Sequence, residues 1–133
     1  MPNHWHFVVW PETDEEVSGF FQWLTVTHTM RWHAHDHASG TGHLYQGRFQ
    51  SFLVQTDRHL LTVPRYVERN PVRATLATRV EDWRWGGAWS RAQDGAQRKG
   101  LPGIWPVRRP GNWLEFVSAP RTEGELAALR HRV

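Results

Sequence analysis

The sequence predicts a domain of the α+β class, because stretches with the composition of β-strands alternate with stretches that have helical spacing. Residues 3–10 are rich in Trp, Phe and Val, which favour a pleated, half-buried environment. Residues 14–33 repeat apolar side chains at the spacing of a helix, and residues 44–55 indicate a strand pair or one bent strand. A second helix is predicted over residues 57–70. At 133 residues with 39% hydrophobic side chains, the chain can bury the core of one domain.

The first predicted strand carries a pair of histidines. Side chains of a strand alternate between its two faces, which places His4 and His6 on one face and Trp5 and Phe7 on the other. Two imidazoles one pleat apart can hold a single divalent cation; the alternative is two polar residues on the solvent face of an edge strand. Spacing alone does not decide, since His-x-His recurs within residues 33–37, where solvated loop histidines are the stronger interpretation.

The first helix is predicted over residues 14–33. Thr13 and Glu16 have the spacing of a capping box, and the acidic residues around them suit a helix N-terminus. An apolar stripe at helical spacing is expected to lie in the core. The stripe consists of Val17, Phe20, Phe21, Leu24 and His28, widened by Trp23 and Met30.

The second helix is predicted to follow a cap at Thr56 or Asp57. Pro71 biases Asn70 away from helical geometry, so the helix is expected to end or kink there. Pro64 removes a backbone donor and either kinks the helix or lies in its first turn. Arginines spaced four residues apart form one basic ridge if the helix persists, and these are Arg65, Arg69 and Arg73.

The remaining chain is less regular. Residues 82–89 form a tryptophan-rich turn that is expected to cover the core. Residues 91–112 are rich in Gly, Pro and basic side chains, which is typical of a loop or linker. Short helices are predicted over residues 112–117 and 122–132.

Positive charge is concentrated after residue 30. Residues 1–30 carry four acidic side chains and no Lys or Arg, so all 16 basic side chains and the other nine acidic ones follow, and the net charge is +3. Lys99 is the only lysine. Arginine suits bidentate phosphate contacts and stacking on bases, so nucleic acid is the first partner to consider. An arginine-rich proteome is the alternative explanation.

The chain contains no cysteine, which excludes disulfides and thiolate zinc sites and is compatible with a reducing cytosol. No apolar run approaches the length of a membrane span, and the N-terminus lacks the basic start and apolar core of a signal peptide. We therefore expect a cytoplasmic protein with no membrane partner.

A nucleophile has to come from a short set of candidates, since Tyr45 and Tyr66 are the only tyrosines and no Ser or Thr has a nucleophile-elbow context. Asn70 follows Tyr66 by four residues, and positions four apart share a helix face. The phenol and the amide can therefore approach the same point. The alternative for Tyr66 is a core or interface tyrosine.

Four stretches, in order along the chain, resemble one protein family: MPNHWHFVVWP (1–11), GHLYQGRFQSFLVQ (42–55), RYVERNPVRA (65–74) and EDWRW (81–85). The segment NWLEFVSAPRTEGELAALR (112–130) resembles the tail of the same proteins. On these stretches the sequence resembles the REP-associated tyrosine transposases, within the wider group of single-tyrosine HUH transposases.

The resemblance implies an antiparallel sheet with helices packed on it, of the ferredoxin-like HUH nuclease type. Family members begin with a further strand and helix, so it also implies that this chain, starting at Met1 inside the motif, lacks both. A catalytic domain is expected over residues 1–90, and a basic linker with a helical tail over residues 91–133.

The resemblance also implies a site and a reaction. His4 and His6 match the histidine pair that binds a divalent cation, Mg²⁺ or Mn²⁺, and Tyr66 matches the nucleophile. Asn70 matches the position of a third polar ligand. The implied reaction is cleavage and rejoining of single-stranded, hairpin-forming repeat DNA through a 5′-phosphotyrosine, without a small-molecule cofactor, in the bacterial nucleoid. DNA contacts are expected from Arg48, Arg65, Arg69, Arg73 and Tyr45.

Two other functions remain open from the sequence. One is a catalytically inactive, truncated module that binds structured single strands through its arginines. The other is a metal-dependent hydrolase that uses bound water in place of Tyr66, which ranks lowest because no carboxylate lies near the histidine pair in sequence to act as a base.

Overall fold

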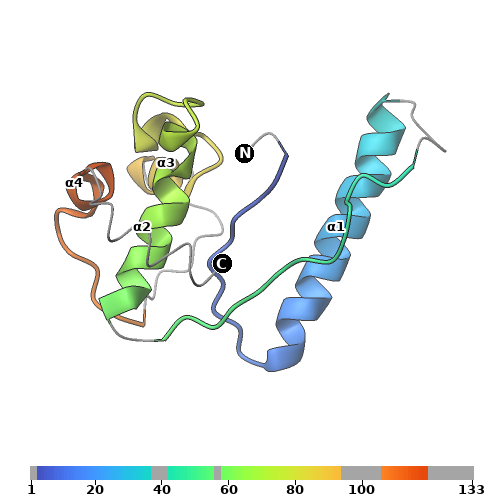
Figure 1. Cartoon of the computed structure of the whole chain (residues 1–133), viewed down its shortest axis with the longest axis horizontal. Helices are drawn as coiled ribbons and strands as arrows, with labels where there is room; N and C mark the ends of the chain where they lie inside the picture. Colours follow the sequence, from blue (N-terminus) through green and yellow to red (C-terminus); the bar gives the residue numbers. More distant parts are fainter. Residues whose placement is uncertain (1–2, 37–41, 56–57, 94–105, 120–133) are drawn as a thin grey trace. The chain divides into compact units, whose positions relative to one another are not determined.

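The computed structural model describes residues 3–36, 42–55, 58–93 and 106–119. Within them the chain forms helical elements, shown in Figure 1: α1 (Asp14–Asp36), α2 (Arg58–Arg73), the 3₁₀ helix η1 (Val80–Asp82), α3 (Gly87–Ala92) and α4 (Trp113–Ser118). None of the helices in these ranges is long and apolar enough to cross a bilayer.

The chain divides into two compact units. One combines the N-terminal segment up to Val8 with the residues from Leu53 onward, and we call it the α2 unit. The other comprises Val9–Phe52, and we call it the α1 unit. The histidine pair and Tyr66 thus belong to the same unit, whereas Tyr45 belongs to the other.

The prediction of an antiparallel, ferredoxin-like sheet is wrong: the described residues contain no β-strand. Residues 4–11 and 48–55 have no regular hydrogen-bonded structure, and residues 44–47 form a bend. Figure 1 draws the N-terminal segment as an irregular tube. A strand is held by backbone hydrogen bonds to a neighbouring strand, and β-favouring side chains alone do not supply them. In the described parts of the chain these segments have no such ladder.

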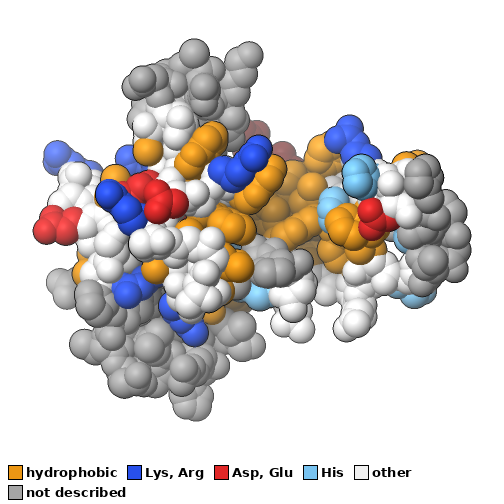
Figure 2. Space-filling view, turned by 90° about the horizontal axis from the view of Figure 1, so that it is seen from above, with side chains coloured by type: hydrophobic (Ala, Val, Ile, Leu, Met, Phe, Trp, Pro, Cys, Tyr) orange, Lys and Arg blue, Asp and Glu red, His pale blue; other side chains and the backbone are white. Residues whose placement is uncertain are grey.

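Helix α1 confirms the predicted first helix and extends it to Asp36. The Glu16 carboxylate accepts hydrogen bonds from the backbone N–H groups of Glu12 (2.7 Å) and Thr13 (3.4 Å), which is one half of the expected capping box. The prediction that the aromatic face of α1 lies in the core is wrong. No residue of α1 is buried, Trp23 is 62% exposed, and Figure 2 shows hydrophobic side chains on the molecular surface.

The hydrophobic core lies in the α2 unit. Helix α2 contacts α4 and η1, and η1 also contacts α3 and α4. The buried side chains of this core are Val80, Ala88, Trp113 and Val117, against which Leu61, Val72 and Phe116 pack. The short helix predicted near residue 112 is confirmed as α4. The one predicted over residues 122–132 lies outside the described residues, as does most of the predicted linker.

Helix α2 continues through both of its prolines and reaches Arg73, so it does not end at Pro71 as the sequence predicted. Pro64 lies in the helix interior and not in its first turn, and both proline rings are buried. A proline inside a helix removes one backbone hydrogen bond. Burial of the two rings against the rest of the α2 unit offsets part of that cost.

A Schellman motif ends α2. The N–H of Leu76 donates to the carbonyl of Pro71 (2.9 Å), and the N–H of Thr75 donates to that of Val72 (3.1 Å). Thr75 takes the left-handed position of this motif with φ of 56°. Glycine normally occupies that position, so the β-branched threonine strains the backbone there.

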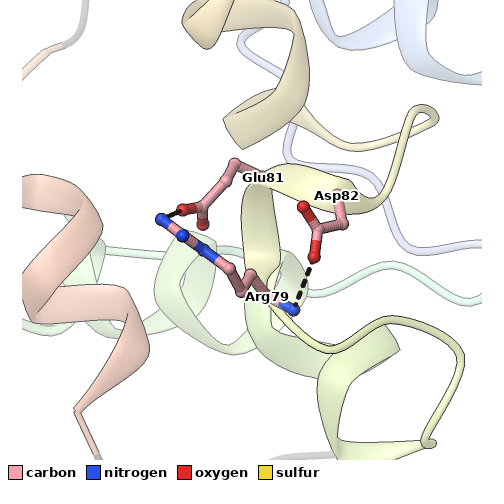
Figure 3. A network of polar contacts seen from close by, with 3 residues as sticks. All are labelled: Arg79, Glu81 and Asp82. Carbon is pink, nitrogen blue, oxygen red and sulfur yellow. Dashed lines mark hydrogen bonds and ion pairs between the residues drawn. The ribbon is translucent and has the colours of Figure 1, made fainter.

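The 3₁₀ helix η1 is held by a local polar network (Figure 3). The backbone N–H of Arg79 donates to the Asp82 carboxylate at 3.1 Å, and the Arg79 guanidinium pairs with Glu81. Hydrogen bonding by the backbone N–H of Glu81, with a smaller contribution from Arg79, lowers the pKa of the Glu81 carboxyl. This network fixes the turn that places Val80 in the core.

Candidate nucleic-acid cleavage site

Helix α2 has two chemically different faces. Tyr66, Asn70 and Arg73 are spaced by four and three residues and so lie on one face of the helix. Leu61 and Val72 pack into the core from the other side. Tyr66 is half-buried, Asn70 is 7% exposed, and Arg73 is exposed. The predicted nucleophile and its neighbours therefore face away from the helix's hydrophobic anchor.

The N-terminal segment keeps the alternation of a strand although it forms no sheet. The rings of His4 and His6 lie 4.9 Å apart between centroids, and those of Trp5 and Phe7 lie 5.9 Å apart. Both ring pairs meet edge to face. The two imidazoles thus lie together, as an extended backbone requires of residues two apart.

The histidine pair meets helix α2 at Tyr66. The rings of His6 and Tyr66 have centroids 5.8 Å apart and an interplanar angle of 74°, which is an edge-to-face contact. The Arg73 guanidinium lies 5.6 Å from the centroid of the same tyrosine ring. Two segments sixty residues apart in the chain therefore bring an imidazole, a phenol and a guanidinium together.

The surroundings of His6 favour the neutral form of its imidazole. Partial burial of the ring lowers the pKa of His6, although much of the residue's surface is exposed, and the neighbouring His4 lowers it further. A neutral imidazole retains a lone pair for a cation. The pKa shift thus agrees in sign with a metal ligand.

The donor set fits a divalent cation at the histidine pair. The Nδ1 of His4 lies 2.7 Å from the Oδ1 of Asn3, and an amide oxygen can only accept, so this contact favours the tautomer with the proton on Nδ1 and the lone pair on Nε2. In the described ranges no three His, Cys, Asp or Glu side chains gather around one point. Two imidazoles would leave positions for water and phosphate oxygens, which Mg²⁺ and Mn²⁺ accept.

Two of the arginines predicted to contact DNA hydrogen-bond to the end of α4 in this structure. Arg65 is buried, donates to the carbonyl of Ala119 at 3.0 Å, and stacks on the Phe116 ring at 4.4 Å. Arg69 donates to the carbonyls of Ser118 (3.1 Å) and Ala119. These carbonyls end helix α4, where cations are favourable. Of the predicted ridge, Arg73 lies beside the Tyr66 ring.

The other two predicted DNA contacts lie in the α1 unit. Tyr45 and Arg48 line a groove between α1 and residues 42–49. The hydroxyl of Tyr45 lies 2.5 Å from the Nδ1 of His28, and burial raises the pKa of Tyr45. Phe49 stacks on Phe21 with centroids 4.7 Å apart. Arg48 is exposed beside these aromatic rings.

Glu68 is the residue that reasoning from the sequence missed. Its side chain is 7% exposed and accepts hydrogen bonds from the Trp113 indole (2.9 Å) and the Arg91 guanidinium. The only sequence signal was an acidic residue in an otherwise basic helix, two positions after Tyr66. Its partners lie 23 and 45 residues away, so local pattern does not reveal them.

Comparison with known protein families gives a match to the N-terminal half of the chain. The family model described as "Transposase IS200 like" matches residues 1–70, which is more than half of the 133-residue chain and includes the histidine pair, Tyr66 and Asn70. No curated protein and no solved structure gives a significant match. On this match, the chain belongs to the family of IS200-like transposases.

Proposed function

We propose that this transposase-family protein cleaves and rejoins single-stranded DNA, with Tyr66 as the nucleophile and hairpin-forming repeats as the substrate. The observation that carries the proposal is the contact between the His6 and Tyr66 rings, with centroids 5.8 Å apart. The sequence places these residues sixty positions apart, so their contact is a property of the tertiary structure.

In the proposed step the phenol oxygen of Tyr66 attacks the scissile phosphorus. The bond between phosphorus and the 3′ oxygen of the preceding nucleotide breaks. The phenol loses its proton, and the departing 3′ oxygen gains one. The products are a 5′-phosphotyrosine and a free 3′-hydroxyl. Attack by a 3′-hydroxyl on the phosphotyrosine reverses the bond changes and rejoins the strand.

Three further residues have roles beside Tyr66. His4 and His6 would hold a divalent cation, with Asn70 as the third donor. When bound, Mg²⁺ or Mn²⁺ supplies positive charge to the non-bridging phosphate oxygens. Arg73 lies over the Tyr66 ring and is exposed, so its guanidinium can bind a phosphate oxygen beside the scissile bond.

The groove of the α1 unit supports binding of a single strand. Its aromatic side chains, Tyr45 and Phe49, offer faces for bases to stack on, and Arg48 offers a phosphate contact. Phosphate contacts by Arg48 and Arg73 would release counterions, so the affinity for DNA is expected to fall as the salt concentration rises.

A trapping experiment with end-labelled DNA tests the proposal. A hairpin-bearing single strand is incubated with the protein and Mn²⁺, and products are separated on a denaturing gel. We expect the 3′-labelled fragment to become linked to protein, and the 5′-labelled fragment to be released with a 3′-hydroxyl that a polymerase can extend. Mass spectrometry should locate the adduct on Tyr66, and chelation of the metal should abolish it.

The matched control is Tyr66→Phe, which keeps the ring and removes only the attacking oxygen. We expect it to bind the hairpin strand as tightly as the wild type and to form no adduct. Cleavage that survives Tyr66→Phe would assign the reaction to bound water. Binding without an adduct in the wild type would identify the protein as a DNA-binding module without catalysis.

A further inference from the structure

The carboxylate of Glu68 joins three helices. It extends from α2, and its side chain is 7% exposed. Oε2 accepts a hydrogen bond from the Nε1–H of Trp113, the first residue of α4, at 2.9 Å, and Oε1 pairs with the guanidinium of Arg91 on α3. A buried carboxylate needs partners of this kind, because burial without them is costly.

The backbone of α3 comes close to this carboxylate at Gly87, where a side chain would displace the ion pair from its present position. A Cβ added at Gly87 would lie 3.2 Å from the Oε1 of Glu68 and 2.9 Å from a guanidinium nitrogen of Arg91. The missing side chain at position 87 therefore leaves room for the ion pair.

A second set of contacts links α2 to the other end of α4. Arg65 and Arg69 donate to the carbonyls of Ser118 and Ala119 at the C-terminal end of α4, while Glu68 accepts from the first residue of α4. Helix α4 is thus attached to α2 at both of its ends. Contacts at two separate points restrict both rotation and sliding of α2 relative to α4.

Tyr66 and Glu68 are two residues apart, which separates them by about 200° around a helix of 3.6 residues per turn. Rotation of α2 about its axis therefore moves both side chains together, in opposite directions. We propose that Glu68 is a positioning residue: its bonds to Trp113 and Arg91 set the rotation of α2 that directs Tyr66 at His6. The catalytic part of this inference rests on the proposed role of Tyr66.

The partners of Glu68 lie beyond the region that the family model matches. That match ends at residue 70, whereas Arg91 and Trp113 follow it. The C-terminal helices of this chain thereby act on the nucleophile helix from the side opposite the histidine pair.

The test compares Glu68→Gln with Val117→Ala in the full chain. Both changes alter the buried interface of α2, α3 and α4, but Val117 is an apolar core residue outside the carboxylate network. Two readouts are measured: the nuclear Overhauser effect between the His6 and Tyr66 rings, and the rate of phosphotyrosine formation on a hairpin strand in Mn²⁺. Thermal unfolding and affinity for the hairpin strand are recorded for each variant.

For Glu68→Gln we expect loss of the His6–Tyr66 signal and a rate reduced about 10- to 100-fold, because a small misplacement of a reacting group has effects of that size. Affinity for the strand should stay within about twofold, since the carboxylate contacts no phosphate. Val117→Ala should lower the melting temperature but retain the ring contact and the rate.

Retention of the ring contact in Glu68→Gln, or its equal loss in Val117→Ala, would overturn the inference. If Glu68→Gln fails to fold, Trp113→Phe decides in the same way, since it removes the indole N–H donor and keeps one aromatic ring in the core. Arg91→Lys, which keeps a cation for the carboxylate, should retain more of the ring contact than Arg91→Ala. Because the ring contact is measured without DNA, a wild type that shows the contact but forms no adduct contradicts the proposed function and not the positioning role.

Discussion

Helix α4 of the α2 unit and helix α1 of the α1 unit place a tryptophan in opposite surroundings. Trp113 in the α2 unit is 4% exposed and its indole N–H is bonded to Glu68, whereas Trp23 in the α1 unit is 62% exposed. Both lie on helices that the sequence predicts, but only α4 packs its tryptophan into a core. A helix can therefore form without burying its aromatic side chains, whereas a defined site requires buried contacts from distant parts of the chain. The two side chains that lie beside the Tyr66 ring, His6 and Arg73, belong to the α2 unit.

Replacing the two tryptophans should give the largest contrast. Trp113→Ala removes a buried indole from the core and leaves Glu68 without one donor, so we expect a loss of about 3–5 kcal/mol in the free energy of unfolding. Trp23→Ala removes a side chain from the surface and should change the free energy of unfolding by less than about 0.5 kcal/mol. Urea denaturation followed by circular dichroism measures both. Equal losses would show that the face of α1 is buried in solution.

The end of α2 offers a stabilising change. Thr75 has φ of 56°, so Thr75→Gly should relieve backbone strain and raise the free energy of unfolding by about 1 kcal/mol. Ala77, which lies outside the Schellman motif, provides the control: Ala77→Gly should not stabilise. A loss of stability in Thr75→Gly, measured by the same denaturation curves, would contradict the strained conformation.

Loss of the hydrogen bonds at the start of α1 should destabilise only that helix. Glu16→Ala removes the acceptor of the Glu12 and Thr13 N–H groups, which weakens the helix start by about 0.5–1 kcal/mol. Because no residue of α1 is buried, we expect hydrogen exchange to speed up in the first turns of α1 while the α2 unit remains unchanged. Faster exchange throughout the α2 unit would instead show that the two units unfold together.

The smallest expected effect is the part of the pH dependence of stability that Glu81 contributes in η1. The folded-state pKa of Glu81 lies below its ordinary value, so its ionised carboxylate contributes stability above that ordinary value. The contribution is lost as the pH falls through the lowered pKa. Glu81→Gln should remove this part of the pH dependence. The difference in melting temperature between wild type and Glu81→Gln, measured from neutral pH to about pH 3, should therefore shrink as the carboxylate protonates. A constant difference would contradict the lowered pKa of Glu81.

The helices were predictable because their signals are local. Apolar spacing and the Glu16 cap predicted α1, and the short helix at Trp113 was expected from the residues around it. The predicted sheet was wrong because strand composition says nothing about whether a partner strand is paired with it. The interior prolines of α2 were also misjudged, since burial of their rings depends on contacts with residues far along the chain.

The site was predictable in part for the same reason. Period-two alternation placed His4 and His6 together in an extended segment even without a sheet, and helical spacing placed Tyr66 and Asn70 on one face. The contact between His6 and Tyr66 and the bonds of Glu68 depend on how distant segments meet. Local pattern likewise assigned Arg65 and Arg69 to DNA, although their guanidinium groups lie on the carbonyls of α4.

The most direct test of the central claim is a titration with Mn²⁺ followed by NMR of the aromatic side chains. A paramagnetic ion held by the histidine pair broadens the resonances of nearby protons. Substoichiometric Mn²⁺ should therefore broaden the rings of His4, His6 and Tyr66 together, and the Tyr66 ring should stay sharp when His4 and His6 are both replaced by Ala. A Tyr66 ring that stays sharp while the two histidines broaden, or that broadens equally in the doubly substituted protein, would contradict a shared site.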